Sequence, residues 1–337
     1  MNARTVLITG AAGFLGSNLA DALLARGHRV IAYDNLSHGL ESNLDDARQN
    51  PRFAFYKGDV CDLDALRRAA QGADVIAHLA AYKIPRYGKA EEMLLINTQG
   101  GQNALEVAAE NRAKFILAST SDVYGKNPAI PFSETSDSVL GASTVARWGY
   151  AVSKLFDEHL ALAYADSRNL PVTIIRIFGS YGPRQALSWW GGPQSVFIDA
   201  ILQDEPVPIH GDGSQTRSFT YVSDTVLGFI AAIERDDANC EIFNIGSTEE
   251  ISIIDLARLI HRLSGSTSPL KLLFTPYNEL SKGRAYEDVS RRIPDVTKAE
   301  RRLGFRAFVG LEDGLQRTIE WQKAVRTAQA ALAALKP

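Results

Sequence analysis

The sequence is poor in cysteine, with only Cys61 and Cys240 among 337 residues. These two lie far apart and have neither the paired spacing of a zinc site nor the density of a disulfide framework. The six histidines also lack the spacing of metal ligands, so we expect no bound metal. Few and unpaired cysteines are typical of a reducing compartment, and we expect the protein to be cytoplasmic.

An excess of positive charge and long hydrophobic runs are also missing. The formal net charge is −3, which gives no electrostatic basis for binding nucleic acid. No apolar run approaches the roughly 18–20 residues that cross a membrane. The N-terminal sequence enters a strand pattern at once and leaves no room for a signal peptide. We therefore expect a globular protein that has neither nucleic acid nor a membrane as a partner.

Short apolar runs alternate with helical patterns through the first half of the chain. The runs are apolar at successive positions, as the strands of a parallel sheet covered on both faces require. This alternation predicts a Rossmann-type, doubly wound α/β fold. The expected strands are Thr5–Gly10, Arg29–Tyr33, Phe53–Asp59, Asp74–Ala80, Lys114–Ser119 and Pro171–Phe178, and the expected helices include Gly13–Arg26, Ala90–Glu110 and Ala146–Ser167.

Three glycines, Gly10, Gly13 and Gly16, lie between the first expected strand and the helix that comes after it. Glycines at these positions let the backbone approach a pyrophosphate, and the helix N-terminus offers free amides and a partial positive charge. Asp34 ends the next expected strand, where a carboxylate accepts hydrogen bonds from an adenosine ribose. The charge of Asp34 would repel a 2′-phosphate, and no lysine or arginine follows it closely, so we predict NAD rather than NADP as the cofactor.

The regular alternation of strand and helix patterns ends after Phe178. The next sixteen residues, 179–194, are rich in glycine, proline and tryptophan and are typical of a structured loop. In that loop Trp189 and Trp190 either form a wall of the binding pocket or pack within the loop. We divide the chain into an NAD-binding Rossmann domain at residues 1–178 and a smaller α/β substrate-binding cap, mainly residues 179–337. Some segments of the second part are expected to return to the Rossmann sheet.

Tyr150 and Lys154 are four residues apart in an expected helix and are therefore neighbours on one helix face. A tyrosine with its ordinary pKa of about 10 is a poor base at neutral pH. A nearby ammonium group and a positively charged nicotinamide would lower that pKa and allow proton transfer from a substrate hydroxyl. The strand that starts at Lys114 ends in the hydroxyls and the carboxylate of residues 119–122, at the sheet edge where α/β proteins bind ligands.

These motifs, in this order, resemble the extended short-chain dehydrogenase/reductase superfamily, specifically its NAD-dependent nucleotide-sugar epimerases, dehydratases and decarboxylases. The resemblance runs from Thr5 to about Phe305 and includes the spacing Gly-x-x-Gly-x-x-Gly. It implies that Tyr150 is the acid/base and that Lys154 binds the cofactor ribose and adjusts the pKa of the tyrosine. It also implies that Thr120 hydrogen-bonds the reacting sugar oxygen.

The resemblance further implies which residues surround the cofactor. Asp59 and Val60 would flank the adenine, although Asp59 alone has a structural alternative as the cap of a helix at Asp62–Ala70. The full set expected to bind NAD is Gly10, Gly13, Phe14, Leu15, Gly16, Asp34, Asn35, Asp59, Val60, Leu79, Ala80, Ala81, Lys83, Asn97, Ser119, Tyr150, Lys154 and Phe178.

Members of this family oxidise a sugar carbon, commonly C4, and differ in how they process the resulting keto-sugar. In the dehydratases of the family that this chain resembles, the matching residues are Thr-Asp-Glu. This chain has Thr120, Ser121 and Asp122 there, so dehydration is disfavoured. In the UDP-glucuronate decarboxylases the matching residues are Ser-Thr-Ser-Glu. Asp122 stands where they have the glutamate and is shorter by one methylene. Gly179 departs from them as well, because decarboxylases and many epimerases have a substrate-contacting asparagine there.

The C4 epimerases tolerate varied residues after the threonine, because they need only let the keto-sugar rotate. C4 epimerisation of a nucleotide hexose, with UDP as the expected nucleotide, is therefore our first prediction. Decarboxylation of a UDP-glucuronate type of substrate is the alternative, with Asp122 as a candidate catalytic residue, and dehydration ranks below both.

The cap is expected to hold the nucleotide sugar. A diphosphate needs cations, and the resemblance assigns Arg217 and Arg292 to it, since a planar guanidinium suits a bidentate phosphate contact. Arg86 and Arg184 are weaker candidates, for which a solvated surface position is the alternative. The full set of expected substrate contacts is Ser121, Gly179, Arg217, Arg292, Arg86 and Arg184.

A non-catalytic, NAD-binding regulatory protein is the remaining alternative. Such members of the superfamily usually lose one of the three catalytic residues, whereas this chain keeps Thr120, Tyr150 and Lys154. The resemblance also implies a homodimer, in which helices Ala90–Glu110 and Ala146–Ser167 of each copy form a four-helix interface.

Overall fold

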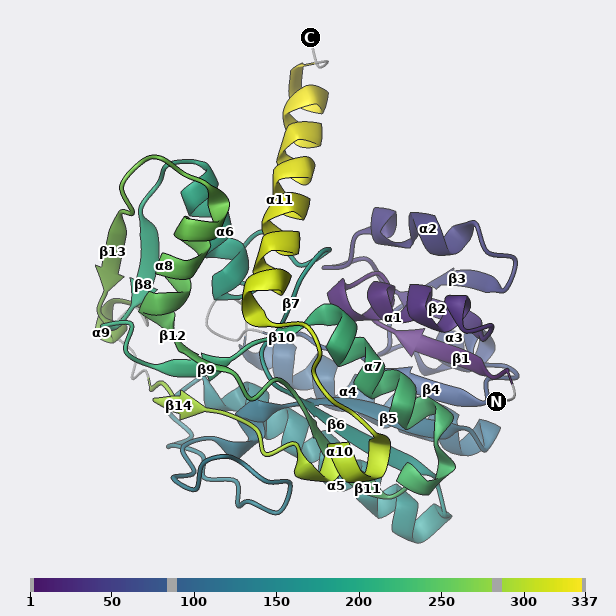
Figure 1. Ribbon diagram of the computed structural model, residues 1–337. Helices are drawn as coiled ribbons and strands as arrows, with labels where there is room; N and C mark the ends of the chain where they lie inside the picture. Colours follow the sequence, from purple (N-terminus) through teal and green to yellow (C-terminus); the bar gives the residue numbers. More distant parts are fainter. Residues whose placement is uncertain (1–2, 84–89, 281–286, 335–337) are drawn as a thin grey trace.

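A seven-stranded parallel sheet forms the centre of the computed structural model, which describes residues 3–83, 90–280 and 287–334 (Figure 1). Its strands are β1 (Thr5–Thr9), β2 (Arg29–Asp34), β3 (Phe53–Lys57), β4 (Val75–His78), β5 (Lys114–Thr120), β6 (Val172–Ile177) and β11 (Glu241–Ile245). Their order in the sheet is β11-β6-β5-β4-β1-β2-β3, so the direction of winding reverses between β1 and β4. In such sheets ligands bind beyond the carboxyl ends of the strands, where the winding reverses.

Helices cover both faces of this sheet. On one face lie α1 (Phe14–Ala25) and α7 (Val222–Glu234), and on the other lie α3 (Leu63–Ala69), α4 (Ala90–Asn111) and α5 (Trp148–Arg168). Successive strand residues point to opposite faces, so Val6 and Ile8 join one core and Leu7 joins the other. All three side chains are fully buried, which explains why the strands are apolar at successive positions.

The strands and helices expected in the first half of the chain are confirmed within a few residues at each end. One detail differs from the expectation for Asp59. The helix α3 has Asp62 as its N-cap, and the Asp62 carboxylate accepts a hydrogen bond from the Ala65 amide at 3.0 Å. The alternative role of Asp59 as the cap of this helix was therefore wrong.

The second half of the chain builds a cap from short strands and helices above the carboxyl edge of the sheet. In it, β8 (Val207–His210) pairs with β13 (Leu272–Thr275), and β9 (Thr216–Ser218) lies between β12 (Glu250–Ser252) and β14 (Arg291–Arg292). The larger cap helices are α6 (Pro193–Leu202), α8 (Ile253–Ser264) and α11 (Leu311–Ala334), and the last of these projects from the body in Figure 1. Shorter elements are η1 (Glu41–Leu44), α2 (Asp45–Arg48), η2 (Ser121–Tyr124), β7 (Ser180–Tyr181), β10 (Thr220–Tyr221), η3 (Asp236–Ala238), α9 (Tyr277–Leu280) and α10 (Thr297–Leu303).

Two segments of the second half belong to the sheet layers rather than to the cap. Strand β11 pairs in parallel with β6 and forms one edge of the central sheet. Helix α7 packs beside α1 on the sheet. A boundary after residue 178 therefore separates the halves along the chain but not entirely in space.

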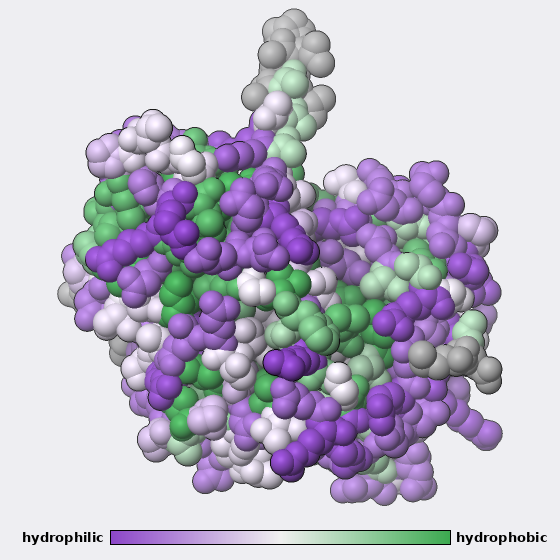
Figure 2. Space-filling view, viewed as in Figure 1, coloured by the Kyte–Doolittle hydropathy of each residue, from purple (hydrophilic) through white to green (hydrophobic). Residues whose placement is uncertain are grey.

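The surface of the molecule is mixed in polarity. The face shown in Figure 2 is largely hydrophilic, and hydrophobic residues gather on it between the cap and the sheet layers. Among the helices of the described ranges, none is both long and apolar enough to cross a membrane.

Candidate active site

A cavity of ≈ 1250 Å³ lies between the carboxyl edge of the sheet and the cap. Its wall takes residues from the ends of β1, β2, β4 and β5 and from the cap segments that face them. The predicted site residues that line it are Gly10, Gly13, Phe14, Leu15, Gly16, Asp34, Asn35, Val60, Leu79, Ala80, Ala81, Lys83, Ser119, Thr120, Ser121, Asp122, Tyr150, Lys154, Gly179, Arg184, Arg217 and Arg292.

The glycine turn needs its glycines for two measurable reasons. Gly10 has a φ of +70°, and a Cβ on it would lie 2.8 Å from the amide nitrogen of Ala80. A Cβ on Gly16 would overlap the carbonyl oxygen of Gly10. Gly13 is the N-cap residue of α1 and provides no side-chain cap. The first amides of α1 thus remain open to an anion, which fits the pyrophosphate of a dinucleotide.

Asp34 is fixed at the end of β2 by two backbone amides. Its Oδ2 accepts a hydrogen bond from Ala12 at 2.9 Å, and its Oδ1 accepts one from Leu36 at 2.8 Å. The residue is only 7% exposed, and burial raises its pKa despite these hydrogen bonds. Each carboxylate oxygen can accept a further hydrogen bond, so the position fits the two hydroxyls of an adenosine ribose.

Three residues predicted to bind the cofactor do not line the cavity. Asp59 accepts a hydrogen bond from the side chain of Asn35 at 2.9 Å and thereby orients a residue that does line it. Asn97 hydrogen-bonds the backbone of Tyr82 through both ends of its amide, at 2.7 and 3.1 Å. Both residues act on the site through their neighbours.

Phe178 is the third of these residues, and its side chain lies outside the cavity. Its side chain is 1% exposed and packs with Val123, Tyr124 and Phe132 in a separate apolar cluster. The residue follows β6 directly, and the preference of a large aromatic ring for that cluster turns it away from the cavity. Arg86, a weaker candidate for substrate binding, lies outside the described residues.

The catalytic trio predicted from the sequence meets at one place. Thr120 is the last residue of β5, and its hydroxyl oxygen accepts a hydrogen bond from the Asp122 amide at 3.2 Å. Tyr150 and Lys154 come from the first two turns of α5, and all three line the cavity. Lys154 is 1% exposed, and its ammonium lies 3.2 Å from Oδ2 of Asp157.

The charge around Tyr150 differs from the expectation. Burial, followed by the carboxylates of Asp122 and Asp157, raises the pKa of Tyr150 above its ordinary value. Lys154 does not reverse this, because Asp157 neutralises its charge within the same helix. In the protein by itself Tyr150 is therefore a neutral phenol, and the chain alone does not favour its phenolate.

Ser119 is held by a buried ion pair behind the site. Its hydroxyl donates a hydrogen bond to the carboxylate of Glu158 on α5. Arg176 on β6 binds the same carboxylate at 2.7 Å, and all three residues are buried. The hydroxyl of Ser119 therefore ties β5 to α5 and is not available as a free donor in the cavity.

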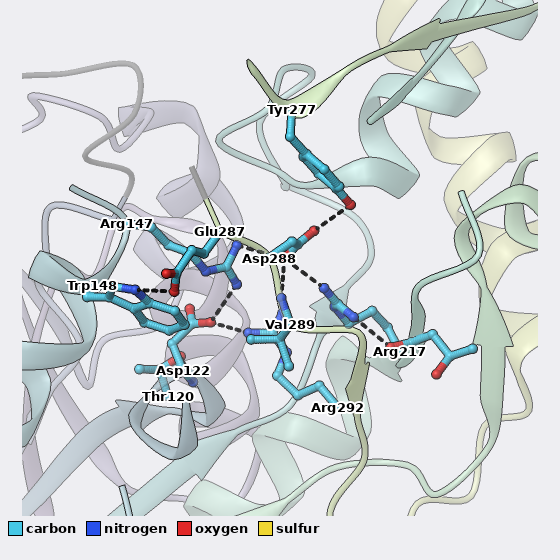
Figure 3. Close-up of polar contacts among 11 residues, drawn as sticks. Thr120, Asp122, Arg147, Trp148, Arg217, Tyr277, Glu287, Asp288, Val289 and Arg292 are labelled. Carbon is cyan, nitrogen blue, oxygen red and sulfur yellow. Dashed lines mark hydrogen bonds and ion pairs between the residues drawn. The ribbon is translucent and has the colours of Figure 1, made fainter. Parts of the chain in front are cut away.

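A cluster of arginines and aspartates lies close to Thr120, with members from η2, from the start of α5 and from the cap (Figure 3). Asp122 pairs with Arg292 and lies 3.5 Å from Arg147. Asp288 accepts hydrogen bonds from Arg147 at 2.8 Å and from Arg217 at 3.0 Å. The members of this charged cluster are Asp122, Arg147, Arg217, Asp288 and Arg292.

The charged cluster has three positive and two negative side chains. Burial opposes ionisation of its aspartates, yet Arg292 and then Arg147 lower the pKa of Asp122. In the same way Arg147 and Arg217 lower the pKa of Asp288 to about 2. Burial, followed by the charge of Arg292, lowers the pKa of Arg217 to about 10. Asp122 and Asp288 are therefore carboxylates at neutral pH, and Asp122 is a hydrogen-bond acceptor rather than an acid.

The predicted substrate arginines do not all come together. Arg217 and Arg292 are paired neighbours on β9 and β14 and share the charged cluster. Arg184 lies elsewhere on the cavity wall, where it binds Asp21 at 2.6 Å and Asp46 at 3.1 Å. These carboxylates belong to α1 and α2, so Arg184 stands on the cofactor side of the cavity.

Gly179 lines the cavity with backbone only. Its φ is +52°, and a Cβ on it would overlap the carbonyl oxygen of Ser218. The chain therefore has no room for an asparagine at this position unless the neighbouring strand moves. Any contact of this position with the sugar comes from the peptide groups.

Two members of the charged cluster, Arg147 and Asp288, were not predicted as site residues. Arg147 precedes Tyr150 by three residues, and Asp288 precedes Arg292 by four. These short separations from predicted site residues were the only signal in the sequence. Their pairing across 141 residues could not be derived from spacing.

The sequence matches the model of one protein family and several known proteins. The model of the family described as "NAD dependent epimerase/dehydratase family" matches residues 6–246. The UDP-N-acetyl-alpha-D-glucosaminuronate decarboxylase of Bacillus cytotoxicus is 40% identical over 321 residues, which cover 95% of this chain and 98% of the relative. UDP-glucuronic acid decarboxylase 1 of Arabidopsis thaliana is 34% identical, over 93% of this chain and 68% of its own length.

Solved structures of known proteins share the fold of this chain. A UDP-glucuronic acid 4-epimerase from Bacillus cereus, in complex with UDP-glucuronic acid and NAD, superposes with a TM-score of 0.85. It is 32% identical to this chain, and the match covers 95% of this chain and 99% of that one. The relatives thus include both decarboxylases and a C4 epimerase.

Proposed function

Because the chain belongs to the NAD-dependent epimerase/dehydratase family and is an NAD-dependent enzyme of nucleotide sugars, we propose that it decarboxylates a UDP-linked uronate. The observation that carries this proposal is the position of Asp122, beside Thr120 and paired with Arg292 and Arg147. The epimerase predicted first from the sequence is not favoured over this alternative. The substrates named for the decarboxylase relatives, both UDP-linked uronates, support the choice.

The chemistry requires a carbonyl next to the carbon that bears the carboxylate. NAD+ held by the glycine turn and Asp34 would supply this carbonyl, because it would take a hydride from C4 of the sugar and return it at the end of the cycle. Its positively charged nicotinamide would also favour ionisation of Tyr150, whose phenolate can then take the proton of the C4 hydroxyl while Thr120 hydrogen-bonds the same oxygen. The C5–C6 bond then breaks, carbon dioxide leaves, and the electron pair moves onto the C4 oxygen, where the two hydroxyl groups stabilise it. C5 afterwards accepts a proton.

The charged cluster suits a substrate that carries one carboxylate on its sugar. Its three arginines and two aspartates leave one positive charge in excess. Both kinds of UDP-sugar carry a diphosphate, but only a uronate adds a carboxylate on the sugar that can balance this excess. Asp122 is held as a carboxylate, so it can accept but not donate a proton, and this argues against the acid role that a dehydratase needs.

C4 epimerisation is the second candidate. Gly179 places no side chain in the cavity, and the resulting space favours rotation of a keto-sugar. The Bacillus cereus epimerase is solved with UDP-glucuronic acid, so a uronate is compatible with this reaction too. The two candidates therefore share a substrate class and differ in the fate of the keto-sugar.

The test is to incubate the protein and NAD with UDP-glucuronate, UDP-N-acetylglucosaminuronate and UDP-glucose in parallel. Mass spectrometry detects the loss of carbon dioxide, and NMR detects inversion at C4 without a change of mass. Release of carbon dioxide from a uronate supports the proposal. A C4 epimer at unchanged mass establishes the second candidate instead.

Two variants of Asp122 make this test specific. Asp122→Glu keeps the carboxylate and lengthens it by one methylene, so it should retain decarboxylation. Asp122→Asn removes the charge that Arg292 and Arg147 bind and should lower the rate of carbon dioxide release far more than the rate of C4 oxidation. Equal losses of both rates would show that Asp122 does not act in decarboxylation.

We also propose that the protein is a homodimer through α4 and α5, which pack side by side. Three large apolar side chains on these helices are exposed in the single chain: Leu95 at 61%, Val152 at 47% and Phe156 at 45%. Burying them against a second copy would remove this apolar surface from water.

A further inference from the structure

Trp190 makes aromatic contacts with two residues from the first half of the chain, and all three line the cavity. Its ring stacks on His38, with centroids 4.4 Å apart and planes at 27°. The edge of a second ring, that of Tyr82, meets it at 5.1 Å and 81°. The carbonyl oxygen of Trp190 lies 3.5 Å from the ammonium of Lys83. A single residue of the loop thus touches three residues of the Rossmann layers.

These partners come from the two loops that flank the cofactor site. His38 follows β2, four residues after Asp34. Tyr82 and Lys83 follow β4, directly after the run that lines the cavity beside Gly10. Trp190 therefore bridges the loops after β2 and β4 from the cap side.

The segment that carries Trp190, residues 182–193, is anchored at its start. Arg184 binds Asp21 on α1 at 2.6 Å and Asp46 on α2 at 3.1 Å. The carbonyl oxygen of Pro183 accepts a hydrogen bond from the side chain of Asn18 at 3.4 Å. The segment is thus attached to the helix whose N-terminus meets the pyrophosphate.

The same segment is internally packed near Trp190. A Cβ on Gly191 would overlap the carbonyl oxygen of Ala186. Gln185 accepts a hydrogen bond from the hydroxyl of Ser195 at 3.2 Å, and both of these side chains are buried. Trp190 is therefore presented by a loop with a defined shape rather than by a freely moving one.

We propose that Trp190 is the residue that retains NAD between turnovers. With its ring against His38 and Tyr82, the loop closes the cofactor cleft, and NAD leaves only after these contacts open. An enzyme that returns its hydride within each cycle has no need to exchange the cofactor, so slow exit is compatible with turnover. The proposal concerns the cofactor and is independent of which sugar is processed.

The neighbouring tryptophan provides a matched control. Trp189 stacks on His210 with centroids 4.2 Å apart and meets Phe197 edge-on at 6.5 Å. Both partners belong to the cap, so Trp189 does not bridge the loops after β2 and β4. Replacing its indole ring with the smaller ring of phenylalanine should leave the exit rate of NAD within about twofold of the parent rate.

The experiment measures the exit rate of the cofactor directly. Protein loaded with NADH is mixed with excess NAD+ in a stopped-flow instrument, and the loss of NADH fluorescence is followed. Trp190→Ala should raise the exit rate on the order of tenfold, because two aromatic contacts are lost. Trp190→Phe, which keeps a ring, should fall between the parent and Trp190→Ala, and Trp189→Phe should match the parent.

A second pair of variants tests whether Trp190 acts through His38. His38→Ala alone should also raise the exit rate, and adding it to Trp190→Ala should give much less than the product of the two effects. If Trp190→Ala does not fold, the exit rates of His38→Ala and Trp190→Phe are measured instead. An exit rate that stays at the parent value in both of these folded variants would overturn the proposal, as would an equal rise in Trp189→Phe.

Discussion

The ammonium of Lys154 lies 3.2 Å from Oδ2 of Asp157, three residues further along α5. The exposed fractions of the two side chains are 2% and 1%, so the pair is shielded from water. A Cβ on Gly101 of α4 would lie 2.5 Å from the other carboxylate oxygen, so the glycine makes room for it. Asp157 thus provides a counter-ion for Lys154, which we predict to bind the cofactor ribose.

Replacing this counter-ion should destabilise the fold. In Asp157→Asn the buried ammonium of Lys154 loses its partner, and the free energy of unfolding should fall by about 3 kcal/mol. Urea denaturation of the variant and the parent measures this difference. The double variant Asp157→Asn with Lys154→Met removes both charges and should recover most of the loss. If the double variant does not recover stability, the unpaired charge of Lys154 is not the cause of the loss.

Tyr150 should be essential for chemistry but not for cofactor binding. Tyr150→Phe removes the acid/base and should lower turnover on the order of 10²- to 10⁴-fold. NAD should still bind, because the glycine turn and Asp34 are unchanged. Turnover is measured with the substrate identified by the carbon dioxide assay, and binding is measured by calorimetry. A variant with parent-like turnover would exclude Tyr150 as the acid/base.

The pKa of Tyr150 should respond to Asp122. Burial and then the charge of Asp122 raise this pKa, so Asp122→Asn should lower it toward the ordinary value. NMR of ring-labelled tyrosine over alkaline pH follows the titration, and Tyr150→Phe assigns the resonance. If the pKa rises or stays unchanged in Asp122→Asn, the charge of Asp122 is not a cause of the raised value.

Acid should weaken the charged cluster in a defined pH range. The pKa of Asp288 is lowered from 3.8 to about 2, so its pairing with Arg147 and Arg217 stabilises the fold fully above pH 3.8. As the pH falls through the folded pKa, about 2 kcal/mol of this stabilisation should be lost. Unfolding by urea between pH 5 and pH 2 measures the loss. Asp288→Asn should show a shallower dependence on pH over the same range.

Gly179 should not tolerate a side chain. Gly179→Ala places a Cβ against the carbonyl oxygen of Ser218 at a φ of +52°, and the free energy of unfolding should fall by about 2 kcal/mol. Gly310 is a matched control, because a Cβ there would meet nothing within 4 Å. Thermal unfolding of both alanine variants distinguishes a local clash from a general effect of replacing glycine.

A single charged residue in the proposed α4–α5 interface should prevent dimer formation. Phe156→Glu on α5 places a carboxylate in the apolar face and should convert a dimer to a monomer in analytical ultracentrifugation. Phe274 on β13 is 48% exposed but lies in the cap, away from α4 and α5. Phe274→Glu should therefore leave the oligomeric state unchanged. A parent protein that sediments as a monomer would rule out the proposed interface.

The sequence predicted the Rossmann sheet and the meeting of Thr120, Tyr150 and Lys154, because strand burial, glycine geometry and helix periodicity act over short stretches of chain. It did not predict the charge around Tyr150, since Asp122 belongs to η2 and Tyr150 to α5, and only the folded chain brings these two elements together. The pairing of Arg147 with Asp288 depends on how the cap folds back over α5. The packing of Phe178 with Val123, Tyr124 and Phe132 was not predicted, because periodicity does not show which neighbouring cluster a large side chain joins.

Strand β11 also limits how this protein can be taken apart. A fragment that ends at residue 178 would leave the backbone groups of β6 unpaired along a long, apolar edge, which is a surface that other chains can add to. The same fragment would lack Asn244, which accepts a hydrogen bond from Tyr124 at 2.7 Å. The cap therefore cannot be exchanged as a cassette, and a chimera between family members needs its junctions on both sides of β11.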